Sequence, residues 1–292
     1  MKLIFLSAMF VAALSIAGSV YAQDRPIADI ADIIGTLVFE QETKLRVIAI
    51  DEAPGRTMNA GTFSSADPEA VKKYMPAGTA PASVSSFVLF AGEDTVLIDT
   101  GAGADVWFTK LTELGIKPEG LKLILITHFH GDHIGGLFQG NARRFPNAKV
   151  LASTLEYDAQ GASFEKIKGA YGEDFVKFNF DDVVFENSLV KVKALDAAGH
   201  SPGHTVFLLE SKQKEEQKLL IIGDLLHAAA LQFPVPEACA SFDRDREKAV
   251  ASRKRILDFA AQENIPIGGM HLPPPSVGKV EKKDSGYSLT LF

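Results

Sequence analysis

The sequence predicts a mixed α/β fold built of packed layers of strands and helices. Three observations support this class. Segments with the pattern of short, mostly antiparallel strands recur along the chain, only three or four segments have the pattern of a helix, and Leu121–Ile126 is a nearly continuous apolar run. An apolar run of strand length indicates a strand that is buried on both faces, as expected in a layered fold.

Residues 1–22 have the features of a secretory signal peptide. Lys2 is followed by the apolar run Leu3–Ile16, and Val20–Ala22 places small residues where signal peptidase cleaves. We expect cleavage after Ala22 and a mature protein that is periplasmic or secreted. The alternative is a membrane anchor, which the short length of the segment disfavours. No other stretch reaches the ~20 apolar residues of a spanning helix, so no membrane contact is expected after cleavage.

Charge and cysteine content narrow the range of partners. The chain has 30 basic and 37 acidic residues, and removal of the leader, which contains one lysine and no acidic residue, changes the formal net charge from −7 to −8. An acidic chain without a concentrated basic patch is a poor candidate for binding nucleic acid, so a small-molecule substrate is the expected partner. Cys239 is the only cysteine, and we expect it to be buried filler.

Residues 23–84 are predicted to form N-terminal strands and an extended arm, which join the core, residues 85–292, in one domain. Strands at 36–40 and 45–50 form a hairpin. Residues 51–83 are rich in Gly, Pro, Ser and Ala and lack periodicity, so they are predicted to be a long loop. Such an arm is also a candidate for the contact between the subunits of a homodimer.

The core is predicted to contain strands and helices in the following order. They are strands at 86–91 and 96–99, a helix at 104–114, strands at 121–126 and 148–152, a short helix that Ser153 caps and that ends at Asp158, strands at 190–195, 205–210 and 219–222, a helix at 246–262 capped by Asp243 or Ser241, and strands at 265–268 and 287–292. Residues 161–182 have no clear pattern. The alternating charges of Lys212–Lys218 indicate a solvated hairpin tip.

The chain contains seven histidines, and three of them lie with Asp132 in the six-residue segment His128–His133. This segment follows the apolar strand, where α/β folds place their sites. His128 and His130 can face one cation. A glycine then lets the chain turn, so that Asp132 and His133 can face a second cation. Because Zn²⁺ accepts imidazole and carboxylate ligands, this spacing predicts a two-metal site rather than a chance group of surface histidines.

Three later motifs supply further candidate ligands, each at the end of a predicted strand. They are Gly199–His204, which contains two histidines, Gly223-Asp224, and Gly269–His271. A carboxylate that lies between two cations can bind one with each oxygen, so Asp224 is suited to bridge them. Taken singly, these residues have less specific explanations: Asp224 can be a turn residue and His271 a loop histidine.

This ordered set of motifs resembles that of the metallo-β-lactamase superfamily over about residues 85–275. Val96–Gly101 is similar to the strand and turn that precede the metal loop in that family. Residues 223–233 and 270–273 resemble the methyl parathion hydrolase-like branch. The resemblance implies an α/β fold, the four-layer αββα sandwich of the metallo-β-lactamase fold.

The resemblance also implies a role for each ligand. One metal would be held by His128, His130 and His200, and the other by Asp132, His133 and His271, with Asp224 as the bridge. His204 would pack beneath the site, and Asp99 would orient a ligand imidazole. The implied cofactors are two Zn²⁺ ions, although the same ligands accept Fe, Mn²⁺ or Co²⁺.

The implied activity is that of a metal-dependent hydrolase. A hydroxide that bridges the two metals would be the nucleophile, and one metal would polarise the carbonyl or phosphoryl oxygen. The substrates would be small molecules with an ester, lactone or phosphotriester bond. Asp132 and His227 are the catalytic candidates, Asp132 as a ligand and His227 as a donor to the leaving group.

Three features of the sequence depart from related enzymes. Asp224 argues against a true two-zinc β-lactamase, in which the resemblance would require a cysteine or a non-ligand there. Lactonases commonly have a tyrosine where this chain has His227, whose role is either donation to the leaving group or packing. Ala159-Gln160 replaces an aromatic pair of the methyl parathion hydrolase-like branch.

Two alternative functions are a lactonase or β-lactamase-like enzyme of the same fold and a non-catalytic exported metal-binding protein. The second alternative would lack an apolar wall for a substrate. The candidates for such a wall, each of which could equally belong to the core, are Phe63, Phe129, Phe138, Leu225, Leu226 and Phe233.

Overall fold

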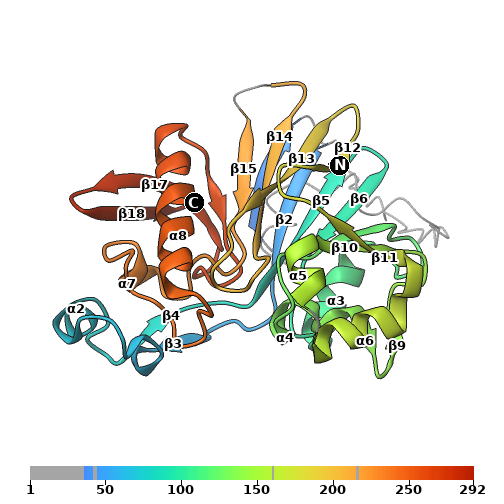
Figure 1. Cartoon of the computed structure of the whole chain (residues 1–292). Helices are drawn as coiled ribbons and strands as arrows, with labels where there is room; N and C mark the ends of the chain where they lie inside the picture. Colours follow the sequence, from blue (N-terminus) through green and yellow to red (C-terminus); the bar gives the residue numbers. More distant parts are fainter. Residues whose placement is uncertain (1–35, 42–44, 160, 215–216) are drawn as a thin grey trace, which may run out of the picture.

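A computed structural model of the chain describes residues 36–41, 45–159, 161–214 and 217–292. The predicted signal peptide and its cleavage site lie outside these residues. Two seven-stranded sheets form the centre of the molecule, and helices cover their outer faces (Figure 1). Within the described ranges, no helix combines the length and the apolar character needed to cross a membrane.

The first sheet has the strand order β1-β2-β5-β6-β7-β10-β11. β1, β2, β5 and β6 pair in antiparallel fashion, whereas β6, β7, β10 and β11 are parallel to one another. The strands are β1 (Thr36–Gln41), β2 (Leu45–Asp51), β5 (Ser85–Ala91), β6 (Asp94–Ile98), β7 (Leu123–Leu125), β10 (Lys149–Ser153) and β11 (Phe175–Phe178).

The second sheet has the strand order β12-β13-β14-β15-β16-β17-β18, and only β15 and β16 are parallel neighbours. The last strand of this order is the edge strand that was predicted for the C-terminal tail. The strands are β12 (Val183–Glu186), β13 (Val190–Asp196), β14 (Thr205–Ser211), β15 (Lys218–Ile221), β16 (Ile267–Gly268), β17 (Val277–Lys283) and β18 (Gly286–Leu291).

The layers are held together by three apolar cores. Side chains of both sheets, such as Phe87 and Phe207, meet in the core between the sheets. Helices α3 (Asp105–Glu113) and α6 (Ala162–Tyr171) pack on the outer face of the first sheet, and α8 (Arg246–Gln262) packs on the outer face of the second. The order helix, sheet, sheet, helix confirms the predicted αββα sandwich.

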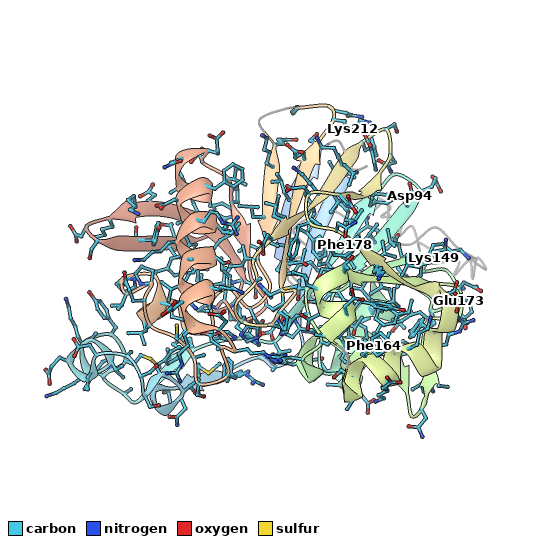
Figure 2. The ribbon with its side chains drawn as sticks, viewed as in Figure 1. Asp94, Lys149, Phe164, Glu173, Phe178 and Lys212 are labelled. Carbon is cyan, nitrogen blue, oxygen red and sulfur yellow. The ribbon has the colours of Figure 1, made fainter. Side chains whose placement is uncertain are left out.

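The strand directions explain where the site forms. β6, β7 and β10 are parallel, so their carboxyl ends meet at one edge of the first sheet. β13, β15 and β16 also run in one direction, because β14 is antiparallel to both β13 and β15. Every predicted ligand motif follows one of these strands. Asp94 and Lys212 lie at the opposite end of the sheets (Figure 2).

The connections contain several short elements. They are α4 (Gly131–Ile134), α5 (Thr154–Ala159), α7 (Ala229–Gln232), 3-10 helices at Gly135–Leu137 and Gly172–Asp174, and a small hairpin of β8 (Phe138–Gln139) and β9 (Ala142–Arg143).

Residues 51–83 do not form the long loop that was predicted. They contain β3 (Thr57–Asn59), a 3-10 helix (Ala60–Phe63), α2 (Pro68–Tyr74) and β4 (Thr79–Pro81). Asp67 accepts a hydrogen bond from the N–H of Glu69, and Pro68 occupies the first helical position, so local capping starts α2. Phe63 and Met75 then pack with Leu231 of α7, which fixes the arm on the core.

Three other expectations about elements differ from the structure. Asp245, rather than Asp243 or Ser241, caps α8 by accepting from the N–H of Lys248. β17 was not predicted, because its four lysine and glutamate residues obscure the strand pattern. The unassigned residues 161–182 form α6, a 3-10 helix and β11.

Candidate metal centre

The structure brings all seven predicted ligands together at the shared edge of the two sheets. His128 and His133 come from the loop after β7 and have no exposed surface. His200, Asp224 and His271 follow strands of the second sheet, and each is 3% exposed. The two sheets therefore contribute ligands from opposite sides of one buried cluster.

The first ligand group consists of His128, His130, His200 and one oxygen of Asp224. The Nε2 atom of His200 lies 3.2 Å from Nε2 of His128 and 2.9 Å from Nδ1 of His130. Oδ2 of Asp224 lies 3.2 Å from Nε2 of His200 and 3.5 Å from Nε2 of His128. Four ligands placed tetrahedrally at about 2.0–2.1 Å from a zinc ion are about 3.3 Å apart, so these separations fit such an ion.

The second ligand group consists of Asp132, His133 and His271. Nε2 of His133 lies 3.8 Å from Oδ1 of Asp132, and Nε2 of His271 lies 3.5 Å from its Oδ2. Oδ1 of Asp224 faces this group at 3.0 Å from His133 and 3.2 Å from His271. Each oxygen of Asp224 therefore faces one group.

The ring nitrogens that face away from the centre have hydrogen-bond partners. Nδ1 of His133 pairs with Oδ2 of Asp99 at 2.6 Å, as the resemblance implied for Asp99. Nδ1 of His200 lies 2.9 Å from Oδ1 of Asp243, and Nδ1 of His271 lies 2.8 Å from a backbone carbonyl. Each partner can accept a hydrogen bond from Nδ1–H, which leaves the Nε2 lone pair to bind a metal.

Two buried atoms of the predicted ligands lack a hydrogen-bond partner, and both face the centre. Nε2 of His133 and Oδ1 of Asp224 lie 3.0 Å apart but form no hydrogen bond with each other or with any other described residue. An unpartnered buried polar atom is costly to the fold. A divalent cation would satisfy both atoms, so the residues present fit a metal.

In the metal-free protein these groups change one another's pKa. Burial lowers the pKa of His128 far below its usual range and that of His130 to about 4, so both rings are neutral at pH 7. Burial also lowers the pKa of His133, but Asp224 and Asp99 raise it more, and the net shift is upward. Burial raises the pKa of Asp224, but the surrounding histidines lower it further, so it stays ionised. A metal at Nε2 of His133 would displace the proton of that nitrogen, which faces Asp224, whereas the Nδ1 proton stays directed at Asp99.

His204 lies beneath the ligands, in the place expected for it. Its Nε2 accepts the backbone N–H of Asp224 at 2.9 Å, and its Nδ1 pairs with the carbonyl of Ala197. Gly223, with a φ of +53°, allows this approach, because a Cβ there would lie 2.4 Å from Nε2 of His204. His204 thus positions the bridging carboxylate through its backbone.

His227 packs directly on the ligand cluster. Its ring is 1% exposed, stacks on His271, and places Nε2 3.1 Å from Oδ2 of Asp224. Its Nδ1 is buried without a hydrogen-bond partner among the described residues. Of the two roles left open for this residue, packing against the bridging carboxylate matches this geometry better than donation to a leaving group.

Sequence reasoning missed Glu156, which joins the two ligand loops. This buried α5 residue accepts the N–H of Phe129 at 3.0 Å through Oε1. Its Oε2 accepts the hydroxyl of Ser201 at 2.7 Å and the N–H of Gly203 at 2.9 Å. No local pattern distinguishes Glu156 from a surface residue of a short helix.

Asp243 was also missed as a partner of a ligand, because it was assigned to the cap of α8. Its carboxylate instead accepts the N–H of Ala240 and lies 3.5 Å from the guanidinium of Arg253, which is buried in α8. Arg253 donates to three backbone carbonyls, which anchors the pair. His200 is therefore oriented by a carboxylate that is itself held from two sides.

A pocket of about 610 Å³ opens beside the first ligand group, and Phe129, His130, His200, Phe242 and Arg244 are among its lining residues. Phe242 is 41% exposed, and its ring packs edge-on against those of His200 and His227. A second pocket, of about 620 Å³, lies between α2, α7 and the β17–β18 hairpin and contains none of the ligands.

Of the six candidates for an apolar wall, Phe129 lines the pocket beside the ligands. The other five are 5% exposed or less, and they pack in the apolar cores that hold the layers and the arm together: Phe63, Phe138, Leu225, Leu226 and Phe233. Cys239 is buried, as expected for a filler.

Comparison with known proteins identifies a family and two curated relatives. Residues 79–268 match the family model described as the metallo-beta-lactamase superfamily. An N-acyl homoserine lactonase of Bacillus cereus is 30% identical over 162 residues, which are 53% of this chain and 57% of the lactonase. An atrochrysone carboxyl ACP thioesterase of Aspergillus chevalieri is 29% identical over 140 residues, which are 47% of this chain and 40% of the thioesterase. The matched stretch thus spans about half the length of these curated relatives.

Two solved structures are similar over most of this chain. AidC, a dizinc quorum-quenching lactonase, has a TM-score of 0.78 and 22% identity over 88% of this chain and 97% of its own. The hydrolase AbOPH of the beta lactamase superfamily has a TM-score of 0.75 and 24% identity over 89% of this chain and 98% of its own. Likeness at these identities shows the fold, and together with the family match it establishes that the chain belongs to the metallo-beta-lactamase superfamily.

Proposed function

We propose that this chain is an exported dinuclear-zinc hydrolase that cleaves ester, lactone or phosphotriester bonds of small molecules. One observation carries the proposal: Asp224 faces His128 and His200 with one oxygen and His133 and His271 with the other. A carboxylate in that position suits two cations better than one. The printed names of the relatives, a homoserine lactonase and a thioesterase, support hydrolysis of an acyl bond.

The residues of the chain would divide the work of the reaction. Two bound divalent cations supply Lewis-acid activation of a water molecule and of the scissile carbonyl or phosphoryl group. Asp99 and Asp243 orient the ligand imidazoles of His133 and His200 through their Nδ1 atoms. Asp132, 29% exposed, is the most accessible acidic ligand and is placed to contact an entering water or substrate. It is therefore proposed as a catalytic residue as well as a ligand.

The position of the site relative to the pocket favours an enzyme over a metal-storing protein. His130 and His200 line a pocket that is open to solvent and large enough for a small substrate. A protein that only stores metal has no need for such an opening. Export, and with it a periplasmic or secreted location, is proposed from the leader-like residues 1–22, and a homodimer through the arm stays a prediction.

The proposal can be tested with purified protein that lacks residues 1–22 and is loaded with excess zinc. We expect two metal ions per chain by elemental analysis and turnover of 4-nitrophenyl butyrate, of N-hexanoyl-homoserine lactone or of diethyl 4-nitrophenyl phosphate. A chelator should abolish that turnover, and zinc should restore it. Two metals without turnover of any of the three compounds would favour the metal-binding alternative, and a single tightly held metal would contradict the dinuclear site.

A further inference from the structure

Apart from the ligand histidines His130 and His200, the pocket beside the first ligand group is lined by one basic residue, Arg244, and two acidic ones, Glu156 and Asp243. Both acidic side chains are buried and already have partners. Glu156 accepts three hydrogen bonds from the ligand loops. Asp243 faces His200 with Oδ1 and accepts the N–H of Ala240 with Oδ2. Neither carboxylate therefore leaves an uncompensated negative charge in the pocket.

The guanidinium of Arg244 is exposed and forms no hydrogen bond or ion pair within the described part of the chain. Its backbone is nevertheless held beside a ligand. The N–H of Arg244 donates to the carbonyl of His200 at 3.2 Å, and the N–H of Asp245 donates to the carbonyl of Gly199 at 2.8 Å. These hydrogen bonds fix the backbone of Arg244 next to a metal ligand, while its cationic side chain has no partner among the described residues.

The same pocket has an apolar surface beside the ligands. The ring of Phe242 is 41% exposed and packs edge-on against His200 and His227. Ala159 and Ala162, also in the lining, have small side chains that leave room. A substrate could thus lay a short carbon chain along Phe242 while its scissile bond faces the ligands.

From this arrangement we infer that Arg244 binds a carboxylate of the substrate, remote from the scissile bond. This inference rests on the proposed function, because it names the substrate class of the same site. The planar guanidinium matches the two oxygens of a carboxylate. A carboxylate carries one negative charge, which a single arginine balances, whereas a phosphate would leave a second charge without a basic partner in this pocket. The favoured substrates are small esters or lactones with an acidic tail.

The test compares two esters that differ only in the distal group. They are 4-nitrophenyl hydrogen adipate and 4-nitrophenyl hexanoate, which have the same leaving group and the same chain length. The variant is Arg244→Gln, and the matched control is Arg246→Gln, which changes an exposed arginine two residues away that does not line the pocket. Metal content and melting temperature of both variants should equal those of the parent protein.

We expect the parent protein to prefer the adipate ester. Arg244→Gln should raise KM for that ester about fivefold or more while kcat is retained, because an exposed charge pair contributes modestly to binding. Hydrolysis of the hexanoate ester should change less than about twofold, and Arg246→Gln should retain the preference. Rising salt should reduce the preference of the parent protein and leave Arg244→Gln nearly unaffected.

A binding measurement separates this inference from the proposed function. Calorimetry with the mono-4-nitroanilide of adipic acid, whose amide resists hydrolysis, should show affinity that Arg244→Gln weakens. Turnover of both esters with no effect of Arg244→Gln on the adipate ester or on binding would overturn the inference and leave the hydrolase intact. Binding that depends on Arg244, without turnover of either ester, would uphold the carboxylate site and count against the proposed hydrolase.

Discussion

Asp224 presents one oxygen to each of two histidine groups, and nothing in its immediate sequence requires this. Its backbone N–H is held by His204, and its Oδ2 lies 3.1 Å from Nε2 of His227. His204, through the backbone, and His227, through the carboxylate, thus position the side chain of Asp224 without a bound cation. Preorganised ligands of this kind bind a metal without the cost of ordering them first.

Asp224→Asn is expected to remove most of the activity. The amide keeps the shape but loses the negative charge, and its NH₂ group cannot bind a cation. We expect the occupancy of at least one metal to fall and kcat to drop at least about 100-fold, measured by elemental analysis and ester hydrolysis. Asp158→Asn, which changes an exposed aspartate of α5, is the control. Normal metal content and rate in Asp224→Asn would refute the bridging role.

His227→Ala distinguishes the two roles considered for this residue. Because its Nε2 contacts Asp224 and the ring is 1% exposed, we expect the variant to slow phenyl acetate and 4-nitrophenyl acetate by similar factors. His227→Gln, which retains a donor, should recover part of the rate. A general acid would instead matter mainly for phenyl acetate, the ester with the poorer leaving group, by about 10²–10⁴-fold. Such an unequal loss would show that His227 donates a proton to the leaving group.

At the scale of elements, α5 links the two loops that contain most of the histidine ligands. Glu156 binds the loop after β7 through Phe129 and the loop after β13 through Ser201 and Gly203. The approach is close, because a Cβ on Gly203 would lie 2.1 Å from the backbone nitrogen of Glu156. Close packing against α5 therefore explains why Gly203 of the Gly199–His204 motif is a glycine.

Glu156→Gln is expected to loosen both loops. A neutral amide cannot accept all three hydrogen bonds, so at least one buried N–H or hydroxyl would lose its partner, at a cost of about 1–3 kcal/mol. We expect metal affinity to fall about tenfold and the melting temperature to fall by a few degrees, measured by metal titration and calorimetry. Glu165→Gln, on the exposed face of α6, should change neither. Unchanged metal affinity in Glu156→Gln would show that the loops hold their geometry without it.

At the scale of the whole molecule, the candidate centre joins the two sheets at one edge. His128 and His133 belong to the first sheet's loops, and His200, Asp224 and His271 belong to the second sheet's loops. A bound metal would therefore act as a cross-link between two layers that otherwise meet through apolar side chains. Global stability should depend on metal for this reason.

Metal removal is expected to lower the melting temperature on the order of 10 °C. A ligand that binds only the folded state, at about 1,000 times its dissociation constant, stabilises it by about 4 kcal/mol. For a domain of this size, each kcal/mol shifts the melting temperature by about 2–4 °C. Differential scanning calorimetry with zinc and with a chelator measures the shift, and added zinc should reverse it. Equal melting temperatures would mean that the centre contributes nothing to the stability of the fold.

The sequence predicted the mixed α/β class, the edge strand at the C-terminus and the motifs that contain the seven ligand candidates, whereas the two-sheet arrangement and the choice of His200 over His204 came from the family resemblance. The features predicted from the sequence depend on local spacing: three histidines within six residues, apolar runs of strand length, and a carboxylate or histidine just after a strand. The partners of those ligands were decided only by the tertiary structure. Asp243 meets His200 from 43 residues away, and Glu156 meets Phe129 from 27 residues away. The tertiary structure also decided that the arm packs on the core and that Arg244 lines the pocket. The periodicity of a sequence does not encode which distant side chains meet where strands of two sheets converge.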